Sequence, residues 1–576
     1  MRLNHPRTSL WLVALALAAC SPVPATEIIY DPDDLRFSGQ EALAIESDFV
    51  QQFPDRDSGQ PNNRLAAAWL AERLARQGLD CRVDDWEFVN YSRLTPLHNA
   101  VCLLPGESDQ EIVLTSHHDQ APTTTQGADN DGSGVAIMVH LAEVLAAEGT
   151  PRYSLVFLFA DAEEFGNAGT RRYLETHPDP GRIVAAISLD NLGKQFYTGL
   201  DIDPRGQFRG YGPIWLQLVA RVAARQAGDL WIPSIRPAVF QALEQAVPIA
   251  FMDEGPFVAR GVPSFGFAGT CAPAFVEDCW STYHTPLDTL DFQSAGTLAQ
   301  AGRVTEALVR QLSSTVVFPQ ESGPYLYFES SAGVLRGMPL TLLFLAPVLG
   351  FLASGFLIDR QPFSPKRRAW RAALPHYLSL FLPLVASIAL LYAMVEVGLL
   401  DKFYAYFATT KDPAWTHPRW LAISLYFFGL VLMIAAARLL AVRFTPPTDQ
   451  PAHPAVRSLA FLAIGLAAVF VIATNPFTLL FTLPLFFWLL IRGRRGLAFL
   501  ADLGFFLLGG LLIYVLIYFF GFAILHIGLY VLWYLLMMFA IGMVSPAGAV
   551  VVAAILAAGL SLVIRPPRGG TSLGDA

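Results

Sequence analysis

The pattern of apolar and polar residues divides the chain into two different parts. Up to about residue 336, short apolar runs alternate with segments in which apolar residues recur at helical spacing. From residue 337 onward the chain is a series of long apolar runs, approximately 337–358, 374–398, 421–441, 458–474, 476–491, 503–524, 526–544 and 546–564. Most of them approach the ~20 residues that a helix needs to span a bilayer. The pattern predicts an N-terminal globular domain followed by an all-α, multi-pass transmembrane domain of about seven or eight helices.

Within the first part, continuous apolar runs predict buried strands, and helical periodicity predicts the helices between them. We expect strands at 79–89, 100–104, 112–115, 153–160 and 184–189, and helices at 62–77, 134–147, 217–226 and 295–312. This alternation predicts an α/β fold with a mixed, mostly parallel sheet and helices on both faces. The expected organisation is an export signal at 1–20, a globular domain at 25–315, a linker at 316–336, a transmembrane domain at 337–565 and a tail at 566–576.

The N-terminus has the layout of an export signal. Arg2 and Arg7 precede an apolar stretch that runs from Leu10 to Ala19 and ends at Cys20. A charged region followed by a short apolar region is typical of such signals. The residues before Cys20 also resemble the lipoprotein-processing box of bacteria, so the segment is either a lipoprotein signal with Cys20 as the lipidated residue, or a plain signal peptide or uncleaved anchor. Each of these places the globular domain outside the cytoplasm.

Positive charges give an independent prediction of topology. They cluster at 366–371, 438–457 and 492–495, which are alternate loops between the apolar runs. The positive-inside rule assigns such loops to the cytoplasm. The globular domain is therefore expected on the periplasmic side of a bacterial inner membrane. Eight crossings would put the C-terminus outside, whereas Arg565 and Arg568 favour the cytoplasm; seven crossings with one re-entrant segment would remove this conflict.

Net charge and cysteine count limit which partners and which redox compartment are expected for the chain. The formal net charge of −9 gives no basic footprint, which argues against nucleic acid as a partner. Of the five cysteines, four remain if Cys20 is lipidated, and four allow three pairings. We favour Cys81–Cys102 and Cys271–Cys279, because an oxidising compartment permits disulfides. The alternative is free thiols in a reducing compartment.

Candidate metal ligands follow the predicted strands. Ser116-His117-His118-Asp119 ends one strand, Glu163 and Glu164 follow another, and Asp190 follows a third. Ligand sites in such sheets lie at the carboxyl ends of the strands, so we expect these side chains to converge. Histidine nitrogen and carboxylate oxygen are zinc ligands. His284 adds a further nitrogen ligand much later in the chain.

This ordered set resembles the zinc exopeptidase family that includes bacterial leucyl aminopeptidases, glutamate carboxypeptidases and glutaminyl cyclases. The resemblance covers roughly residues 40–315. It rests on His117-x-Asp119, Gly127-Ala128-Asp129-x-x-x-Ser133-Gly134, Glu163-Glu164, Ser188-Leu189-Asp190-Asn191 and Tyr283-His284-Thr285-x-x-Asp288-Thr289.

The resemblance implies a role for each matching residue. His117 and Asp190 match the terminal ligands of one zinc ion, and Glu164 and His284 match those of the other. Glu163 matches the general base, and Asp119 matches the partner that supports His117.

One residue departs from the family pattern. Asn130 occupies the position of an aspartate that bridges the two metals, and an amide is neutral. Two zinc ions are expected from the family, one if Asn130 weakens the second site. The neighbouring Asp129 or Asp131 is a candidate substitute.

Three functions follow from the resemblance. The first is a membrane-bound zinc aminopeptidase that hydrolyses peptides with a free N-terminus on the extracytoplasmic side. The alternatives are a glutaminyl-cyclase-like transferase with one zinc, and a non-catalytic peptidase-like assembly module. Membrane lipid is an expected partner in each case, and the sequence identifies no protein partner.

Overall fold

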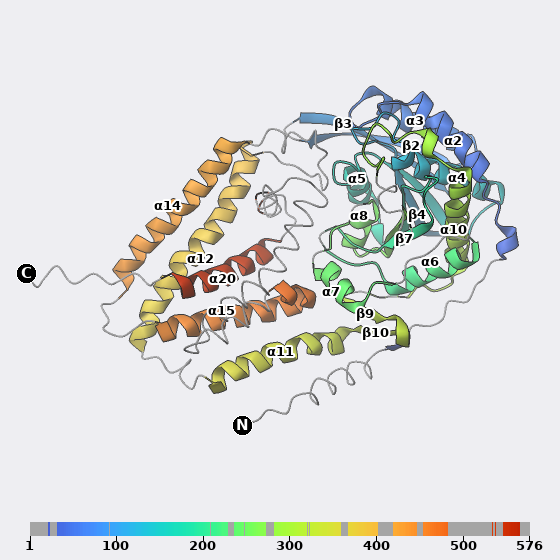
Figure 1. Cartoon of the computed structure of the whole chain (residues 1–576). Helices are drawn as coiled ribbons and strands as arrows, with labels where there is room; N and C mark the ends of the chain where they lie inside the picture. The colour runs from blue at the N-terminus through green and yellow to red at the C-terminus, as the bar shows by residue number, and fades with distance from the viewer. Residues whose placement is uncertain are drawn as a thin grey trace, which may run out of the picture. The chain divides into compact units, whose positions relative to one another are not determined.

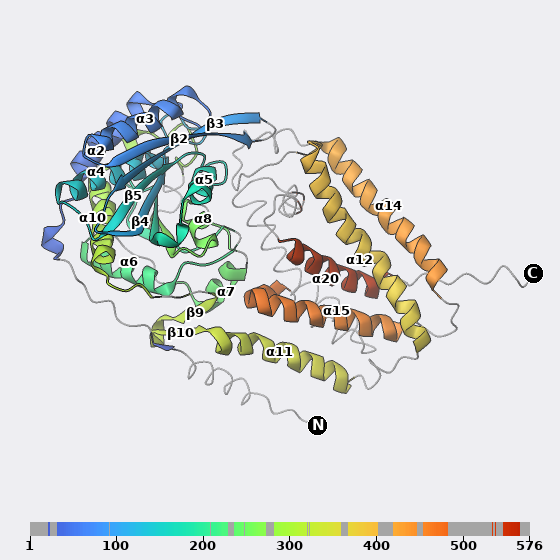
Figure 2. The same cartoon turned by 180° about the vertical axis from the view of Figure 1, so that it is seen from behind.

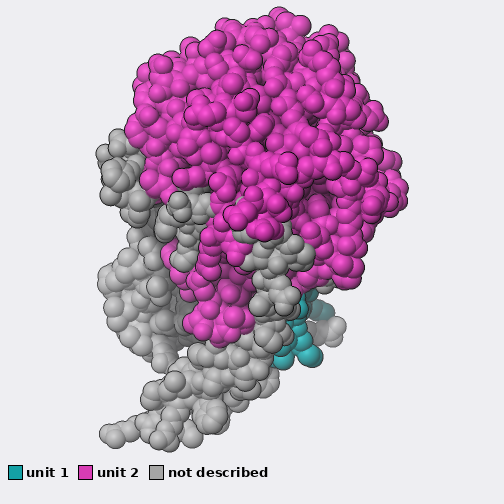
Figure 3. Space-filling model, turned by 90° about the vertical axis from the view of Figure 1, so that its right-hand side faces the viewer, with its two compact units in different colours: residues 1–20, 335–403, 413–576 teal, residues 21–334, 404–412 magenta. Residues whose placement is uncertain are grey.

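The computed structural model of the chain describes residues 21–22, 31–90, 93–207, 209–227, 235–246, 248–250, 252–271, 281–319, 321, 323–358, 367–400, 419–445, 453–481, 533, 536 and 545–564. The chain divides into two compact units. Unit 2 comprises residues 21–334 and 404–412, and unit 1 comprises residues 1–20, 335–403 and 413–576 (Figure 3). Cys20 and Cys279, which the sequence marks as modification and disulfide candidates, lie outside the described residues.

A seven-stranded mixed sheet forms the centre of unit 2 (Figure 1). Its strands are β2 (Asp80–Asn90), β3 (Arg93–Leu104), β4 (Ser108–His117), β5 (Tyr153–Ala160), β6 (Ile183–Asp190), β7 (Gly199–Asp203) and β8 (Ser264–Thr270). Their order in the sheet is β2-β3-β5-β4-β6-β8-β7. The four central strands β5, β4, β6 and β8 are parallel, and β2, β3 and β7 add antiparallel margins. The predicted mixed α/β sheet is confirmed, with its parallel part at the centre.

Helices cover both faces of this sheet (Figures 1 and 2). One face carries α2 (Gly39–Gln52), α3 (Pro61–Ala75), α4 (Gly134–Ala147), α6 (Ile214–Ala227) and α10 (Ala295–Ser314), and the other carries α5 (Ala168–Thr176) and α8 (Glu254–Ala259). Strand β5 shows why both faces are covered, because every one of its residues is buried. Leu155, Phe157 and Phe159 lie in the apolar core on the α2, α3, α4, α6 and α10 side, and Val156 and Leu158 lie in the apolar core on the α5 and α8 side. Alternation along a strand sends successive side chains to opposite faces.

The apolar runs locate the strands but understate their length. The predicted helix at 134–147 and strand at 153–160 coincide with α4 and β5. Strand β4 begins at Ser108, four residues before the predicted run at 112–115. The prediction misses this part of the strand because its residues are polar and partly exposed. A search for continuous apolar residues finds only the buried part of such a strand.

Residues 325–336, within the predicted linker, form β9 (Tyr325–Phe328) and β10 (Gly333–Arg336). These strands belong to a second, three-stranded sheet with order β1-β10-β9. Strand β1 (Ser21–Pro22) pairs antiparallel with β10, and Ser21 lies opposite Val334. Helix α7 (Ala238–Ala246) holds β9 through its side chains: Gln245 accepts the backbone N–H of Tyr325 at 3.1 Å.

Unit 1 consists of apolar helices in the part of the chain that is described. These are α11 (Gly337–Ile358), α12 (Arg367–Glu396), α14 (Trp420–Phe444), α15 (His453–Thr474) and α20 (Pro546–Val563). Among the described residues, three segments are long and apolar enough to cross a membrane: Ala373–Glu396, Trp420–Phe444 and Ala455–Thr474. In α14 only 11% of the most apolar stretch is buried, so large apolar side chains face outward, as expected for contact with lipid. Of the other predicted runs, 503–524 lies outside the described residues, 526–544 does so except for residues 533 and 536, and 476–491 is described only as far as residue 481.

Candidate metal centre

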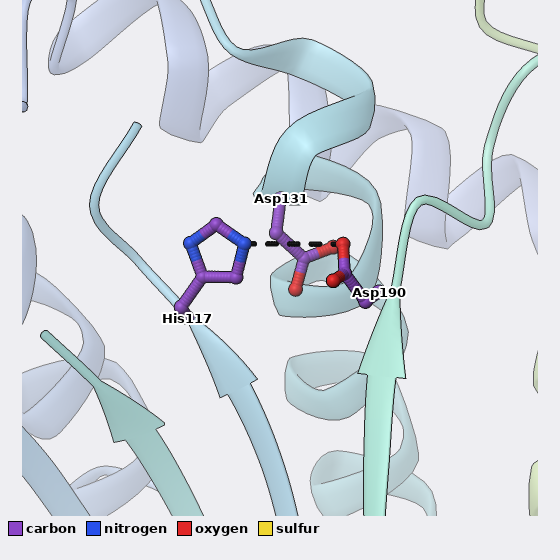
Figure 4. A group of neighbouring side chains, drawn as sticks. All are labelled: His117, Asp131 and Asp190. Carbon is purple, nitrogen blue, oxygen red and sulfur yellow. Dashed lines mark ion pairs between the residues drawn. The ribbon is translucent and has the colours of Figure 1, made fainter. Parts of the chain in front are cut away.

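The predicted ligands meet at the carboxyl end of the parallel strands. His117 is the last residue of β4 and Asp190 is the last residue of β6, and these two strands are neighbours in the sheet. Glu163 and Glu164 follow the end of β5, on the other side of β4. His117 and Asp190 therefore point into the same space, with Nε2 of His117 3.9 Å from Oδ1 of Asp190 (Figure 4).

Two groups of side chains in the described structure have ligand atoms close enough to hold a metal ion. The first is His117, Asp131 and Asp190, and the second is His117, Glu163 and Glu164. His284 joins the second group, since its Nε2 lies 2.9 Å from Oε1 of Glu164. Imidazole nitrogen with carboxylate oxygen is the donor set that zinc takes in proteins, so the residues present fit a zinc ion.

Asn130 lies between the two groups and contacts both. Its Oδ1 is 3.0 Å from Nε2 of His117. Its Nδ2 is 2.7 Å from Oε1 of Glu164 and 2.9 Å from Nε2 of His284. The side chain is 2% exposed, so these contacts are screened little by water. The residue that departs from the family pattern therefore occupies the centre of the site.

Of the two acidic neighbours of Asn130, Asp131 faces the centre. It accepts hydrogen bonds from the Ser116 hydroxyl and from the backbone N–H of Gly134 and Asn191. A Cβ atom on Gly134 would lie 2.5 Å from both carboxylate oxygens of Asp131, so glycine is required there.

Asp129 points elsewhere in the site. Its carboxylate accepts the Tyr197 hydroxyl at 2.6 Å and pairs with Lys194 at 3.2 Å. Asp129 is therefore not a substitute ligand in this structure, whereas Asp131 is placed to be one.

Asp119 supports His117 from behind. Its Oδ1 lies 3.3 Å from Nδ1 of His117 and accepts the backbone N–H of Glu163 at 3.2 Å. A carboxylate on the remote nitrogen fixes the imidazole orientation and directs Nε2 to a metal. The next residue, His118, is fully buried outside both metal groups, and burial lowers its pKa to about 4.

Glu163 belongs to a buried polar network next to the centre. Asn167 donates to Oε1 of Glu163 at 3.3 Å and to Oδ1 of Asp253 at 3.4 Å. Thr170 holds the same oxygen of Asp253 at 2.5 Å, and Gln207 donates to Oδ1 of Asn167 at 3.0 Å. Asn167 therefore has both ends of its amide occupied, which fixes the position of the carboxylate of Glu163.

The dense packing of acidic groups shifts their protonation. Burial, followed by repulsion from Glu164 and Asp190, raises the pKa of Glu163 well above its ordinary value. Burial opposes the charged form of His117, but hydrogen bonds to Asp119 and Asp190 outweigh it and raise the pKa of His117. A cluster of carboxylates around one imidazole is a site that favours cations.

Backbone conformation at the site is unusual in four places. Ala162, Asn167, Asn191 and His284 have positive φ values of 59°, 57°, 54° and 55°. Such values are sparsely populated by residues other than glycine and gather at functional sites. Ala162 precedes Glu163, and Asn191 follows Asp190, so both turns aim a candidate residue into the centre.

The structure describes both cysteines of one predicted disulfide and one cysteine of the other. Cys81 and Cys102 lie opposite each other in β2 and β3 and form a disulfide, as predicted. Cys271 is also disulfide-bonded, and its predicted partner Cys279 lies outside the described residues.

Further residues complete the site. The sequence assigns no role to Arg56, because an isolated polar residue in a loop carries no periodic signal. Asn167 and Asp253 lie in segments that resemble the family, Asp253 in its late substrate-side segment, without a role of their own. Asp288 was visible only as part of the motif that contains His284. Its carboxylate accepts the backbone N–H of Asp129 at 2.8 Å and of Asn130 at 3.2 Å, which ties the two loops together.

Comparison with known proteins finds a family and several relatives that are similar to the part of the chain that contains the site. Residues 99–309 match the family described as Peptidase family M28. The BOS complex subunit NCLN of Rattus norvegicus is 24% identical over 198 residues, which cover 32% of this chain and 33% of that protein. The alkaline phosphatase isozyme conversion protein of Escherichia coli is 28% identical over 204 residues, covering 31% of this chain and 57% of that protein. The chain thus spans about a third to somewhat over half the length of these curated relatives.

Solved structures with a similar fold include two enzymes. Glutaminyl cyclase of Porphyromonas gingivalis is 19% identical, with a TM-score of 0.41 over 48% of this chain and 99% of that one. A zinc aminopeptidase of Bacillus subtilis is 15% identical, with a TM-score of 0.41 over 48% of this chain and 96% of that one. Residues 99–309, the stretch that matches peptidase family M28, contain both groups of candidate ligands.

Proposed function

We propose that the chain is a membrane-bound, zinc-dependent aminopeptidase that acts on the extracytoplasmic side of a bacterial inner membrane. The observation that carries the proposal is the convergence of His117, Asp190, Glu164 and His284, with Glu163 beside them. The family match supports the peptidase fold. The apolar helices of unit 1 support membrane attachment, and the clusters of positive charge in alternate loops support the orientation.

A zinc ion held by these residues would lower the pKa of a water molecule and polarise a peptide carbonyl. The remaining chemistry belongs to Glu163. Its Oε2 is 4.0 Å from Nε2 of His117, within the centre, and its raised pKa suits a group that accepts a proton and later releases it. Glu163 would take the proton from the attacking water and deliver it to the leaving amine.

Specificity for a free N-terminus follows from charge. Asp131, Glu163, Glu164, Asp190 and Asp253 surround the centre, and all except the partly exposed Glu163 are buried. A protonated or metal-bound terminal amine complements such a surface, whereas an acylated terminus brings no charge. The site is thus suited to removing N-terminal residues.

The proposal is tested with the full-length chain in detergent. Peptides with free and N-acetylated termini are compared before and after removal of zinc by a chelator. Release of the first residue from the free peptide only, lost on chelation and restored by zinc, is the expected result. Equal cleavage of both peptides, or activity that survives chelation, would contradict it. Cyclisation of an N-terminal glutaminyl peptide without hydrolysis would instead identify the transferase alternative.

A second candidate function is a non-catalytic, protein-binding module of a membrane assembly. The observation that favours it is the similarity to BOS complex subunits, whose name describes a part of a complex. Absence of metal from gently purified protein, together with stable co-purification of another membrane protein, would favour this function over the peptidase.

A further inference from the structure

The amide of Asn130 presents a different atom to each half of the centre, one half containing His117 and the other containing Glu164 and His284. Its oxygen faces His117, with Oδ1 and Nε2 3.0 Å apart. Its nitrogen faces the other half, 2.7 Å from Oε1 of Glu164 and 2.9 Å from Nε2 of His284. An aspartate would present an oxygen to both halves, so the amide makes the two halves chemically unequal.

The orientation of this amide follows from its neighbours. Nδ2 of Asn191 donates to Oδ1 of Asn130 at 3.4 Å, and a donor can only face the oxygen. Turning the amide over would bring two oxygens, from Asn130 and Glu164, into contact at the 2.7 Å now spanned by a hydrogen bond. Exchange of the oxygen and nitrogen would therefore lose two favourable contacts and create a repulsive one.

The nitrogen side of the amide blocks a second ion. An amide nitrogen carries two hydrogens and is a donor only. One hydrogen is directed at Oε1 of Glu164, and Nε2 of His284 lies 2.9 Å from both that oxygen and the amide nitrogen. Both groups are thereby engaged through the atoms with which they would bind zinc. The oxygen side differs because Oδ1 carries lone pairs: it accepts a hydrogen bond from Nε2 of His117 in this structure, and with His117 and Asp190 it offers a third zinc-binding atom.

We infer that this centre holds a single divalent ion, bound by His117, Asp190 and Oδ1 of Asn130, and that the NH₂ group of Asn130 takes the place of a second ion between Glu164 and His284. A neutral residue cannot offset the repulsion between two adjacent dications, which agrees with one ion. Asp131 lies in the same group and places a further carboxylate beside the proposed ion. The inference shares with the proposed function its metal site, but it does not depend on the reaction.

The experiment measures zinc per chain by elemental analysis after purification of the full-length protein in excess zinc and removal of unbound metal. The wild type is expected to hold about one zinc ion, and Asn130→Asp about two, because aspartate restores an oxygen to each half. His117→Ala and Asp190→Asn should lose the ion. Glu164→Gln and His284→Ala are the matched variants on the other half and should retain it. Cobalt substitution reports the same difference through the absorption spectrum, and thermal unfolding identifies any variant that fails to fold.

Two zinc ions in the wild type would overturn the inference, and so would loss of the ion in Glu164→Gln with retention in Asp190→Asn. A folded wild type without metal would overturn both the inference and the proposed aminopeptidase. One ion with the expected dependence on His117 and Asp190, but no peptide hydrolysis, would uphold the inference and reject the proposed function alone.

Discussion

The carboxylate of Asp288 accepts the backbone N–H of Asp129 at 2.8 Å, across 159 residues of sequence. It also accepts the backbone N–H of Asn130, and burial raises its pKa to about 6. Asp288 thus holds the loop that places Asn130 and lies on the segment that carries His284. One carboxylate couples the positions of two candidate metal residues.

Asp288→Ala should lower both stability and zinc affinity. Two buried N–H groups would lose their acceptor, at a cost of about 1–3 kcal/mol each. Asp288→Asn keeps one acceptor oxygen and should have a smaller effect. The measurement is the unfolding midpoint together with zinc affinity by chelator competition. The exposed Asp291, three residues away, is the matched control as Asp291→Ala. Equal effects of Asp288→Ala and Asp291→Ala would reject this role.

Arg56 should be required for folding of the same region. Its buried guanidinium donates to the backbone oxygens of His118 at 2.9 Å and of Gly127 at 2.7 Å, and to Oε1 of Gln120 at 3.0 Å. Arg56→Leu removes these donors and should destabilise the chain by ~3–5 kcal/mol. Denaturant unfolding checks this, with the exposed Arg76→Leu as the control that should change little. A wild-type unfolding midpoint for Arg56→Leu would contradict the assignment.

The disulfide between Cys81 and Cys102 makes a prediction about compartment. It closes a loop of 21 residues, for which chain entropy gives ~3 kcal/mol of stabilisation. Cys81→Ser combined with Cys102→Ser should lower the thermal midpoint of the domain, and reduction of the wild type should do the same. In intact cells both thiols should resist alkylation until a reductant is added. Ready labelling without reductant would place the domain in a reducing compartment and contradict the export signal.

Membrane topology can be tested loop by loop. The positive-inside rule places residues near 365 and 450 in the cytoplasm and residues near 410 outside. Alkaline phosphatase, which folds only outside the cytoplasm, should be active when fused after residue 410 and inactive when fused after 365 or 450. The opposite pattern of activity would reverse the proposed orientation of the catalytic domain.

The sequence predicts His117, Glu164 and Asp190 as ligands because each follows an apolar strand, whereas His284 is visible only through its motif. His117 ends β4, Asp190 ends β6, and parallel strands deliver their carboxyl ends to one edge. Prediction fails where tertiary contacts decide. The neutrality of Asn130 is visible in the sequence, but the direction of its amide is set by Glu164, His284 and Asn191. No local pattern encodes those contacts.

Elements without an apolar run were missed for a related reason. Helix α2 has a modest apolar face interrupted by charged residues, and its Glu46 is fully buried. Burial and the nearby Asp129 raise the pKa of Glu46 well above its ordinary value. From the sequence alone, a glutamate in this position is predicted to face solvent, because buried glutamates are rare.

The most direct measurement compares peptide hydrolysis by the wild type and Glu163→Gln at equal zinc content. Glutamine preserves the shape of Glu163 but cannot accept a proton, so aminopeptidase activity should fall by ~10²–10⁴-fold. Zinc content should stay unchanged, because Glu163 is not among the proposed ligands. The predicted result is this loss of activity in Glu163→Gln with the zinc content of the wild type. Unchanged turnover in Glu163→Gln, or no hydrolysis by a zinc-loaded wild type, would contradict the proposal that this centre is a peptidase site.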